Sequence, residues 1–377
     1  MKILVISPDF PSVDSIDFIF VEELCKTFVN KGHEIVVIAP QSISKVLFKG
    51  KKLVKFENIV SSRGGTFKLY RPWHITLGLG LFSEYISSVL FNFVVNLTAN
   101  IIKFTPDICY GHFWHSAFAI SRFAINKNIP LFVASGEENI RTHFKYSVKK
   151  LNYFLDYLSG IIAVSTKVKN EIIEMSLTKD DKCIVIPNSI DSQLFRPLDK
   201  DTIRKKFGIS KKDFIVIYVG QFSERKGGNR LSNALNLLND NNIKGLFIGR
   251  GAENPDYANT LFKGSVSHNL LAVYLNCADI FVLPTLNEGC SNAIVEALAC
   301  GLPIVSSDLP FNHDILNVEN SILVDPYDIS AIANAIKLLK DNSEKRRDLS
   351  IGAIKTSLEL TLELRAMKIL EYIRNNI

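Results

Sequence analysis

One stretch of the sequence decides the fold: Asp279-Ile-Phe-Val-Leu-Pro-Thr-Leu-Asn-Glu-Gly-Cys-Ser-Asn-Ala-Ile-Val-Glu-Ala-Leu-Ala-Cys-Gly-Leu-Pro303. Its first apolar run predicts a buried strand, Ser291 is a good helix N-cap, and the late glycine predicts where the helix stops. Glu288 therefore lies in the loop beyond the carboxyl end of a strand. Asn292 and Glu296, four positions apart, share one face of the helix. We expect both carboxylates to face one crevice at the edge of a sheet.

A second strand signal upstream adds positive charge to the same crevice. The run Phe214-Ile-Val-Ile-Tyr-Val-Gly220 predicts another buried strand, and the loop after it carries Arg225 and Lys226 next to Gly227. Two adjacent cations are by themselves an ordinary solvated charge run, but the strand before them and the glycine after them favour a functional loop. Together with the backbone amides at the start of the Ser291 helix, they predict a binding site for a diphosphate.

Strand and helix signals alternate along the whole chain, which is typical of α/β proteins with parallel sheets. The pattern predicts two doubly wound, Rossmann-like domains joined near residues 188–197. Because ligands bind beyond the carboxyl ends of such strands, we expect the site in a cleft where the two domains face each other. Further short apolar strands are predicted at Leu131–Ala134, Gly160–Val164, Ile184–Ile186, Gly245–Ile248 and Ile304–Ser306.

These motifs resemble family 4 of the retaining glycosyltransferases, whose architecture of two Rossmann-like domains is called GT-B. The family's two glutamates, separated by seven residues, fall on Glu288 and Glu296, and its Arg-Lys-Gly loop falls on residues 225–227. Its linker signature falls on Ile186-Pro-Asn-Ser-Ile-Asp191. The resemblance extends over nearly the whole chain, and includes two early strands and a histidine-ending strand at Lys2–Pro8, Gly32–Ile38 and Pro106–His112.

The resemblance implies a domain organisation and an activity. Residues 1–195 would form an acceptor-side domain, residues 196–357 a domain that binds the nucleotide sugar, and a final helix at about 358–377 would pack back on the first domain. The activity would be transfer of a sugar from a nucleotide-diphosphate sugar to a hydroxyl acceptor, with retention, in polysaccharide, lipopolysaccharide or glycolipid biosynthesis. No cofactor or metal is expected, because fixed cations and helix amides can stabilise the departing diphosphate.

The resemblance also assigns roles to particular residues. Glu288 is expected to contact the sugar and Glu296 the ribose, whereas Arg225 and Lys226 hold the diphosphate and His112 lies near the transferred sugar. The remaining donor-side candidates are Ser291, Asn292, Gly289, Cys290, Gly220, Arg250, Gly251 and Val266.

The acceptor side departs from the family pattern. Where relatives have His-Gly-x-Asp, this chain has Ser135-Gly-Glu-Glu138, so Gly136 and Glu138 are the acceptor-side candidates. His115 competes with His112, because a lone histidine is more often a hydrogen-bonded structural residue than a catalytic one. The glycine-rich turn that relatives have after the first strand is absent here, which leaves the geometry of the acceptor open.

Two other functions share the diphosphate site: a nucleotide-sugar epimerase of the same fold, and a binding protein without turnover. Rival motifs are weaker. The run Gly78-Leu-Gly80-Leu-Phe-Ser83 lacks the last glycine of a dinucleotide fingerprint. The run Asp199-Lys-Asp201 imitates a metal-binding pair, but it stands where acids begin a helix, so we expect a helix cap.

Charge distribution points to an anionic partner on the N-terminal side. The chain has 377 residues and a net charge of +6, and residues 1–196 carry 23 Lys and Arg against 17 Asp and Glu, whereas the rest carries 21 against 21. No basic stripe with interleaved aromatics suggests nucleic acid, so an acidic lipid surface is the alternative to a small anion. In the apolar run Ile86–Ile102, Asn92 and Asn96 lie opposite a row that includes Val89 and Phe93, which predicts an amphipathic helix and not a membrane span.

Six cysteines without Cys-x-x-Cys spacing predict thiols in a reducing compartment. The apolar run at the beginning, Lys2–Pro8, is too short for a secretory signal and is expected to form a strand. We therefore expect a cytoplasmic protein, with peripheral contact to the inner face of the membrane as an open question.

Overall fold

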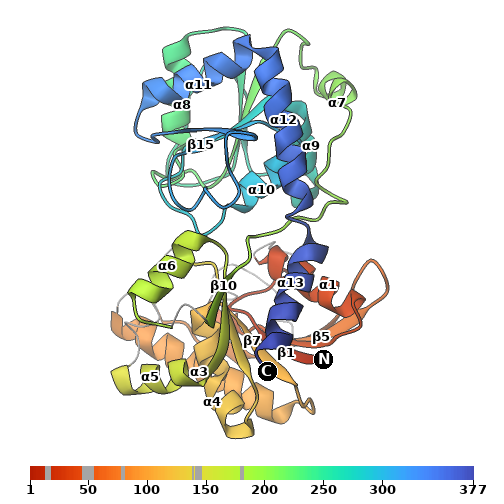
Figure 1. The fold of residues 1–377 in the computed structure, drawn as a ribbon, viewed down its shortest axis with the longest axis vertical. Helices are drawn as coiled ribbons and strands as arrows, with labels where there is room; N and C mark the ends of the chain where they lie inside the picture. The colour runs from red at the N-terminus through yellow and green to blue at the C-terminus, as the bar shows by residue number, and fades with distance from the viewer. Residues whose placement is uncertain (13–17, 45–54, 78–80, 138–139, 141–146, 179–181) are drawn as a thin grey trace. The chain divides into compact units, whose positions relative to one another are not determined.

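The computed structural model describes residues 1–12, 18–44, 55–77, 81–137, 140, 147–178 and 182–377 (Figure 1). The chain folds into two compact units. Unit 1 consists of Met1–Ile186 and Ala366–Ile377, and unit 2 consists of Pro187–Arg365. The last residues of the chain thus return to the unit that contains the first.

The described residues of unit 1 form an eight-stranded sheet with the order β10-β9-β8-β7-β1-β2-β5-β4. All neighbours are parallel except β4 and β5, which are joined by a tight turn in which the Ser61 N–H donates to the Gly65 carbonyl at 2.7 Å. A connection this short can only join antiparallel strands, so the prediction of purely parallel sheets is wrong at this edge. The strands are β1 (Lys2–Ile6), β2 (Glu34–Ile38), β4 (Phe56–Val60), β5 (Thr66–Tyr70), β7 (Ile108–His112), β8 (Leu131–Ser135), β9 (Leu158–Ala163) and β10 (Cys183–Val185), with a separate parallel pair, β3 (Gln41–Ser42) and β6 (Trp73–His74).

Helices cover both faces of this sheet (Figure 1). On one face, Ala366 and Ile369 of α13 join Ile3 of β1 in a single apolar cluster to which α1 also contributes. On the other face, α4 packs closely against β7. A Cβ added to Gly111 would lie only 2.3 Å from the Cα of Ala117. The helices of unit 1 are α1 (Ile19–Asn30), α3 (Leu81–Ile101), α4 (Trp114–Lys127), α5 (Val148–Tyr157), α6 (Thr166–Glu174) and α13 (Leu362–Asn375).

The long helix α3 confirms one prediction and corrects another. The helix itself is present, but its polar and apolar sides are placed differently from the expectation. Asn96 lies against α4, where its Nδ2 donates to the Ala119 carbonyl and its Oδ1 accepts the Phe123 N–H at 3.0 Å. The apolar row that includes Val89 and Phe93 is exposed instead. The half-buried amide is stable against α4 because both its donor and its acceptor are used.

The described residues of unit 2 form a six-stranded, fully parallel sheet with the order β13-β12-β11-β14-β15-β16. Counted along the unit, this is the order 3-2-1-4-5-6 of dinucleotide-binding domains. The strand order reverses between β11 and β14, and this reversal point is where such sheets bind ligands. The strands are β11 (Phe214–Val219), β12 (Ile243–Ile248), β13 (Thr260–Gly264), β14 (Ile280–Leu283), β15 (Ile304–Ser307) and β16 (Ser321–Val324).

Helices α8 and α11 pack together on one face of this sheet, and α9, α10 and α12 lie on the other (Figure 1). Ser291 is the N-cap residue of α10, as predicted, although its side chain makes no capping hydrogen bond. The helices of unit 2 are α7 (Lys200–Phe207), α8 (Gly228–Leu238), α9 (His268–Cys277), α10 (Asn292–Ala299), α11 (Ile329–Asp341) and α12 (Ser343–Leu358).

The fold agrees with the predicted α/β class and its two sheet-containing domains. Strands β3, β4, β5, β6, β13 and β16 were not predicted, whereas the other strands were predicted within one or two residues. Within the described ranges, no helix has both the length and the apolar character that a membrane crossing requires. All six cysteines fall within those ranges and are buried thiols.

Candidate functional site

The loops after β11 and β14 meet at the point where the strand order of unit 2 reverses. The loop after β11 carries Arg225 and Lys226, and the loop after β14 carries Glu288. The predicted residues from two distant parts of the sequence are therefore brought together by the parallel pairing of two central strands.

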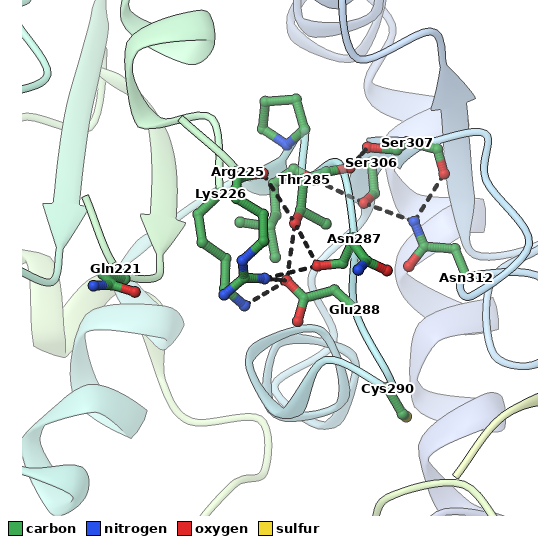
Figure 2. Close-up of polar contacts among 12 residues, drawn as sticks. Gln221, Arg225, Lys226, Thr285, Asn287, Glu288, Cys290, Ser306, Ser307 and Asn312 are labelled. Carbon is green, nitrogen blue, oxygen red and sulfur yellow. Dashed lines mark hydrogen bonds and ion pairs between the residues drawn. The ribbon is translucent and has the colours of Figure 1, made fainter. Parts of the chain in front are cut away.

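The carboxylate of Glu288 is the centre of this site (Figure 2). Lys226 Nζ donates to Glu288 Oε1, and the same oxygen accepts from Thr285 Oγ1 at 2.9 Å and from Arg225 NH1 at 3.4 Å. Glu288 is 5% exposed, so it is a buried anion held by two cations and a hydroxyl. A buried charge is tolerated only when it is paired in this way.

The backbone fixes the cationic loop against the strand ends. The Arg225 carbonyl accepts the Leu286 N–H at 2.8 Å, and Arg225 NH1 donates to the Asn287 carbonyl at 2.7 Å. Gly227 has a φ of 77°, and a Cβ there would lie 2.5 Å from the Pro284 carbonyl oxygen. The glycine of the Arg-Lys-Gly motif is thus needed for both its conformation and its lack of a side chain.

A polar layer beneath the site was not predicted. Ser306 Oγ donates to the Leu283 carbonyl at 2.7 Å, and Ser307 Oγ donates to the Thr285 carbonyl at 2.5 Å. Asn312 Nδ2 donates to Ser307 O at 2.8 Å, and the same side chain contacts Ser306 (Figure 2). These buried hydrogen bonds fix the end of β14, from which the Glu288 loop starts.

The start of α10 adds backbone amides to the site. Gly289, Cys290 and Ser291 are buried and lead directly into the helix. Asn188 Nδ2 donates to the Cys290 carbonyl at 2.9 Å, which ties the linker to this loop. Burial raises the pKa of Cys290 to about 11, so its thiol stays neutral. Asn292 Oδ1 is buried without a hydrogen-bond partner among the described residues, which is unusual outside a ligand site.

The second glutamate has a partner that the sequence did not reveal. Glu296 is on α10, as predicted, and the ring nitrogen Nε2 of His268 lies 3.1 Å from its Oε1. The His268 ring packs edge-on against Phe195, with centroids 5.0 Å apart. His268 is the first residue of α9 and follows Val266, which is half-buried in the loop after β13. Glu296 therefore has a fixed orientation.

The predicted donor loop after β12 is attached to the end of β11. The Gly220 N–H donates to the Ile248 carbonyl at 3.0 Å, and the Phe222 N–H donates to the Arg250 carbonyl at 3.0 Å. A Cβ at Gly251 would lie 2.0 Å from the Phe222 carbonyl oxygen, so only glycine fits there. The structure thus brings Gly220, Arg250 and Gly251 into one loop cluster next to the cationic loop.

The predicted histidine of unit 1 lies at the corresponding point of the other sheet. His112 ends β7, next to β1, where the order of the first sheet reverses. It is 5% exposed, and its ring centroid lies 5.2 Å from that of Phe20 and 4.7 Å from that of Phe113. His115 instead contacts Phe91 of α3, with ring centroids 4.5 Å apart.

The acceptor-side segment contains a half-buried carboxylate that was not predicted. Glu138 lies outside the described residues. Its neighbour Glu137 accepts the Trp114 N–H at 2.7 Å, at the first residue of α4, and the Gly136 N–H at 3.1 Å. Ser135 Oγ also donates to Glu137, at 3.1 Å. Burial raises the pKa of Glu137 to about 7 in spite of these three donors.

The rival metal motif forms a helix cap. Asp199 is the N-cap of α7, and its carboxylate accepts the Thr202 N–H at 3.2 Å. No group of three or more His, Cys, Asp or Glu side chains placed to hold a metal occurs among the residues that the structure describes.

Two family models match the chain. The model of glycosyltransferase family 4 matches residues 19–194, and the model of the group 1 glycosyl transferases matches residues 199–356. The junction between the two matches lies within the linker that connects the two sheets.

Individual relatives agree with these matches. The protein named TuaC of Bacillus subtilis, a teichuronic acid biosynthesis glycosyltransferase by its name, is 28% identical over 239 residues, which cover 61% of this chain and 60% of TuaC. The chain spans about 60% of the length of the first curated relatives it matches.

Solved structures show the same fold over the whole chain. Sucrose-phosphate synthase of Thermosynechococcus elongatus superimposes with a TM-score of 0.77 at 18% identity, over 99% of this chain and 98% of that one. HepE of Anabaena, solved in complex with UDP-glucose, superimposes with a TM-score of 0.70 at 16% identity over 100% of both chains. The chain therefore has the GT-B fold and belongs to the glycosyltransferases, with residues 19–194 matching family 4 and residues 199–356 matching group 1.

Proposed function

We propose that the protein transfers a sugar from a nucleotide-diphosphate sugar to a hydroxyl group of an acceptor. The observation that carries the proposal is the convergence of Arg225 and Lys226 on buried Glu288 at the reversal point of unit 2, beside the start of α10. Cations, helix amides and carboxylates in one place suit a donor that has a diphosphate at one end and sugar hydroxyls at the other.

Stabilisation of the departing diphosphate is the main contribution to rate. When the bond between the anomeric carbon and the diphosphate oxygen breaks, negative charge grows on the diphosphate. Lys226 has three N–H donors, so its pair with Glu288 leaves donors for an anion while holding the ammonium in place. Because these groups are fixed before the reaction, they need no reorganisation, and this supports a reaction without a metal ion.

We assign the reaction to the retaining class. The acceptor oxygen bonds to the anomeric carbon on the face from which the diphosphate leaves, and the acceptor proton passes to an oxygen of that diphosphate, which yields a nucleoside diphosphate. In this mechanism Glu288 positions the sugar and Glu296 the ribose, and neither is a nucleophile. Since Glu288 is already occupied by two cations and a hydroxyl, it is better suited to positioning than to covalent attack.

The acceptor is proposed to be a saccharide or a lipid-linked saccharide. Relatives named for teichuronic acid and capsular polysaccharide biosynthesis support polysaccharide synthesis as the setting. The six buried thiols fit a reducing compartment, so we place the reaction in the cytoplasm.

Donor binding is the first test. The full chain is heated with UDP-, GDP- and ADP-sugars, beginning with UDP-glucose because the HepE structure contains it. A ligand at a hundred times its Kd stabilises the protein by about 2.7 kcal/mol, which is readily seen as a rise in Tm. If no nucleotide sugar raises Tm, the proposal fails.

Acceptor-dependent release of nucleotide separates the remaining functions. A transferase releases nucleoside diphosphate in proportion to acceptor, an epimerase converts the nucleotide sugar without an acceptor, and a binding protein does neither. Anomeric NMR signals of the product test retention, and a chelator added to the assay tests whether a metal is required.

A variant pair tests the assigned residues. We expect Glu296→Ala to abolish detectable transfer while unfolding stays cooperative. The matched control is Glu319→Ala, which removes a carboxylate that is 65% exposed in the same unit. Unchanged turnover of the Glu296→Ala variant would show that Glu296 is not needed for transfer.

A further inference from the structure

An exposed apolar row runs along α3. Its members, spaced four residues apart, are Tyr85, Val89, Phe93, Leu97 and Ile101, and each side chain is 44 to 69% exposed. Neighbours at this spacing touch each other, but each step of four residues turns about 40° beyond a full turn, so the row winds around roughly 160° of the helix. At 1.5 Å per residue the row is about 24 Å long. Single exposed apolar side chains are ordinary, but a continuous row of this length marks an interaction surface.

A groove extends this row toward α4 and α5. It has a volume of about 520 Å³ and is lined by Val89 and Phe93 of α3, by Phe118 of α4, and by Tyr153 and Phe154 of α5. Tyr153 is itself 63% exposed. The row and the groove together, which we call the α3–α5 surface, are formed by three helices, of which α4 contacts both α3 and α5.

Cations are the charged groups at the groove. Its lining residues include Arg122 of α4 and Lys150 of α5 but no Asp or Glu, and both side chains are exposed. The charge of the whole unit has the same sign. Unit 1 carries 24 Lys and Arg against 17 Asp and Glu, a net charge of +7, whereas unit 2 carries 20 against 21, a net charge of −1.

We propose that the α3–α5 surface binds the surface of an anionic lipid bilayer. Exposed apolar side chains along a helix, with cations beside them, match a layer that is apolar below and negatively charged above. The row enters the boundary between headgroups and acyl chains, and Arg122 and Lys150 contact lipid phosphates. The proposal names a surface on which the excess positive charge of unit 1 contacts an anionic partner, and it does not depend on sugar transfer.

Vesicle sedimentation tests the proposal directly. The full chain is mixed with vesicles of phosphatidylcholine, with and without phosphatidylglycerol. We expect binding to the anionic vesicles, weakened by salt because surface charges are screened within about 10 Å at 0.1 M. Binding that is absent, or equal for both vesicle types, would overturn the proposal.

Two double variants separate the apolar and the cationic contributions. Phe93→Ser with Leu97→Ser is expected to weaken binding to anionic vesicles by about tenfold or more, because two apolar side chains no longer enter the bilayer. Arg122→Gln with Lys150→Gln is expected to weaken it by roughly thirtyfold, at about 1 kcal/mol for each cation. The matched control is Val318→Ser with Leu358→Ser, which removes two exposed apolar side chains from unit 2.

The outcomes are distinct from one another. Equal binding by the wild type and both α3–α5 variants overturns the assignment of the surface. The lipid assignment is wrong if the wild type binds no vesicles, forms a dimer without lipid in light scattering, and becomes a monomer on Phe93→Ser with Leu97→Ser. In that case the surface binds a second copy of the chain. Because UDP-glucose binding is measured on the same variants, failure of the donor proposal is recognised separately.

Discussion

The two units place their central strands in the same order but carry different chemistry where that order reverses. In unit 2, Arg225 and Lys226 meet at the carboxylate of Glu288. In unit 1, His112 lies among the rings of Phe20 and Phe113. Parallel pairing creates a site at each reversal point, and the side chains of the loops decide what each site can do. The charged site suits an anionic leaving group, and the aromatic site, where His112 can form a hydrogen bond, suits an uncharged polar group of the substrate.

Of the changes at the two reversal points, loss of one cation should have the largest effect. Lys226→Met is expected to lower kcat/KM by about 10²- to 10³-fold, the usual effect of removing one fixed group that stabilises developing negative charge. The control is Lys206→Met, which removes an exposed lysine of α7. Equal activity of the two variants would show that unit 2 does not use its charges for leaving-group stabilisation.

The half-buried carboxylate of unit 1 predicts a dependence of stability on pH. The pKa of Glu137 is about 7 in the folded protein against 4.5 for the ordinary group, so the folded state binds more protons between these values. Stability is therefore fully present below pH 4.5 and falls as pH rises toward 7, by at most about 3 kcal/mol. Glu137→Gln should remove this part of the pH dependence.

The effect of Glu137 on stability can be measured on unit 1 alone. Both tryptophans of the chain, Trp73 and Trp114, lie in unit 1, so their fluorescence follows urea unfolding of this unit alone. Identical pH profiles for the wild type and Glu137→Gln would contradict the assigned ionisation.

Removal of the His112 side chain from the aromatic site of unit 1 should slow transfer without weakening donor binding. We expect His112→Ala to lower kcat/KM for transfer by about tenfold to hundredfold, which corresponds to one lost hydrogen bond to a charged or polar reacting group. The Kd of UDP should not change. The control is His115→Ala, and a larger loss in that variant would move the role from His112 to His115.

The smallest predicted effect concerns the orientation of Glu296. His268→Ala should weaken UDP binding by roughly threefold to tenfold, since the carboxylate loses one hydrogen bond that fixes it. The loss should be smaller for a 2′-deoxyribose nucleotide, which lacks a hydroxyl for Glu296. A suitable control is His313→Ala, which breaks a comparable but exposed pair with Asp308. Equal losses for both nucleotides would show that His268 does not act through the ribose.

Local sequence pattern predicted the parts of the site that depend on short stretches of chain. The Glu288 loop and α10 follow from a strand signal, an N-cap residue and a glycine within one segment. The polar layer under the site could not be predicted in this way, because Ser306 and Asn312 belong to a later strand and loop with no motif of their own. Only the pairing of β14 with β15 brings them to the end of the Glu288 strand.

Edges and helix faces were predicted least well. Strands β4 and β13 alternate between exposed and half-buried residues, so neither has the continuous apolar run of a central strand. On α3, asparagines were expected to face water, but Asn96 finds its partners in the backbone of α4. A polar side chain with all its hydrogen bonds satisfied gives no sign in the sequence that it is half-buried.

The return of α13 to unit 1 affects the order in which the two units can fold during synthesis. The interior of unit 1 includes Ile369 and Ile373, which the ribosome adds after the whole of unit 2, beside Ile3, which it adds before unit 2. Unit 2 contains all of its own residues between these two points, so it can close while the chain is still growing. Unit 1 therefore begins before unit 2 and closes after it, and until α13 is made the side of its sheet that α1 covers only in part keeps exposed apolar residues that invite aggregation.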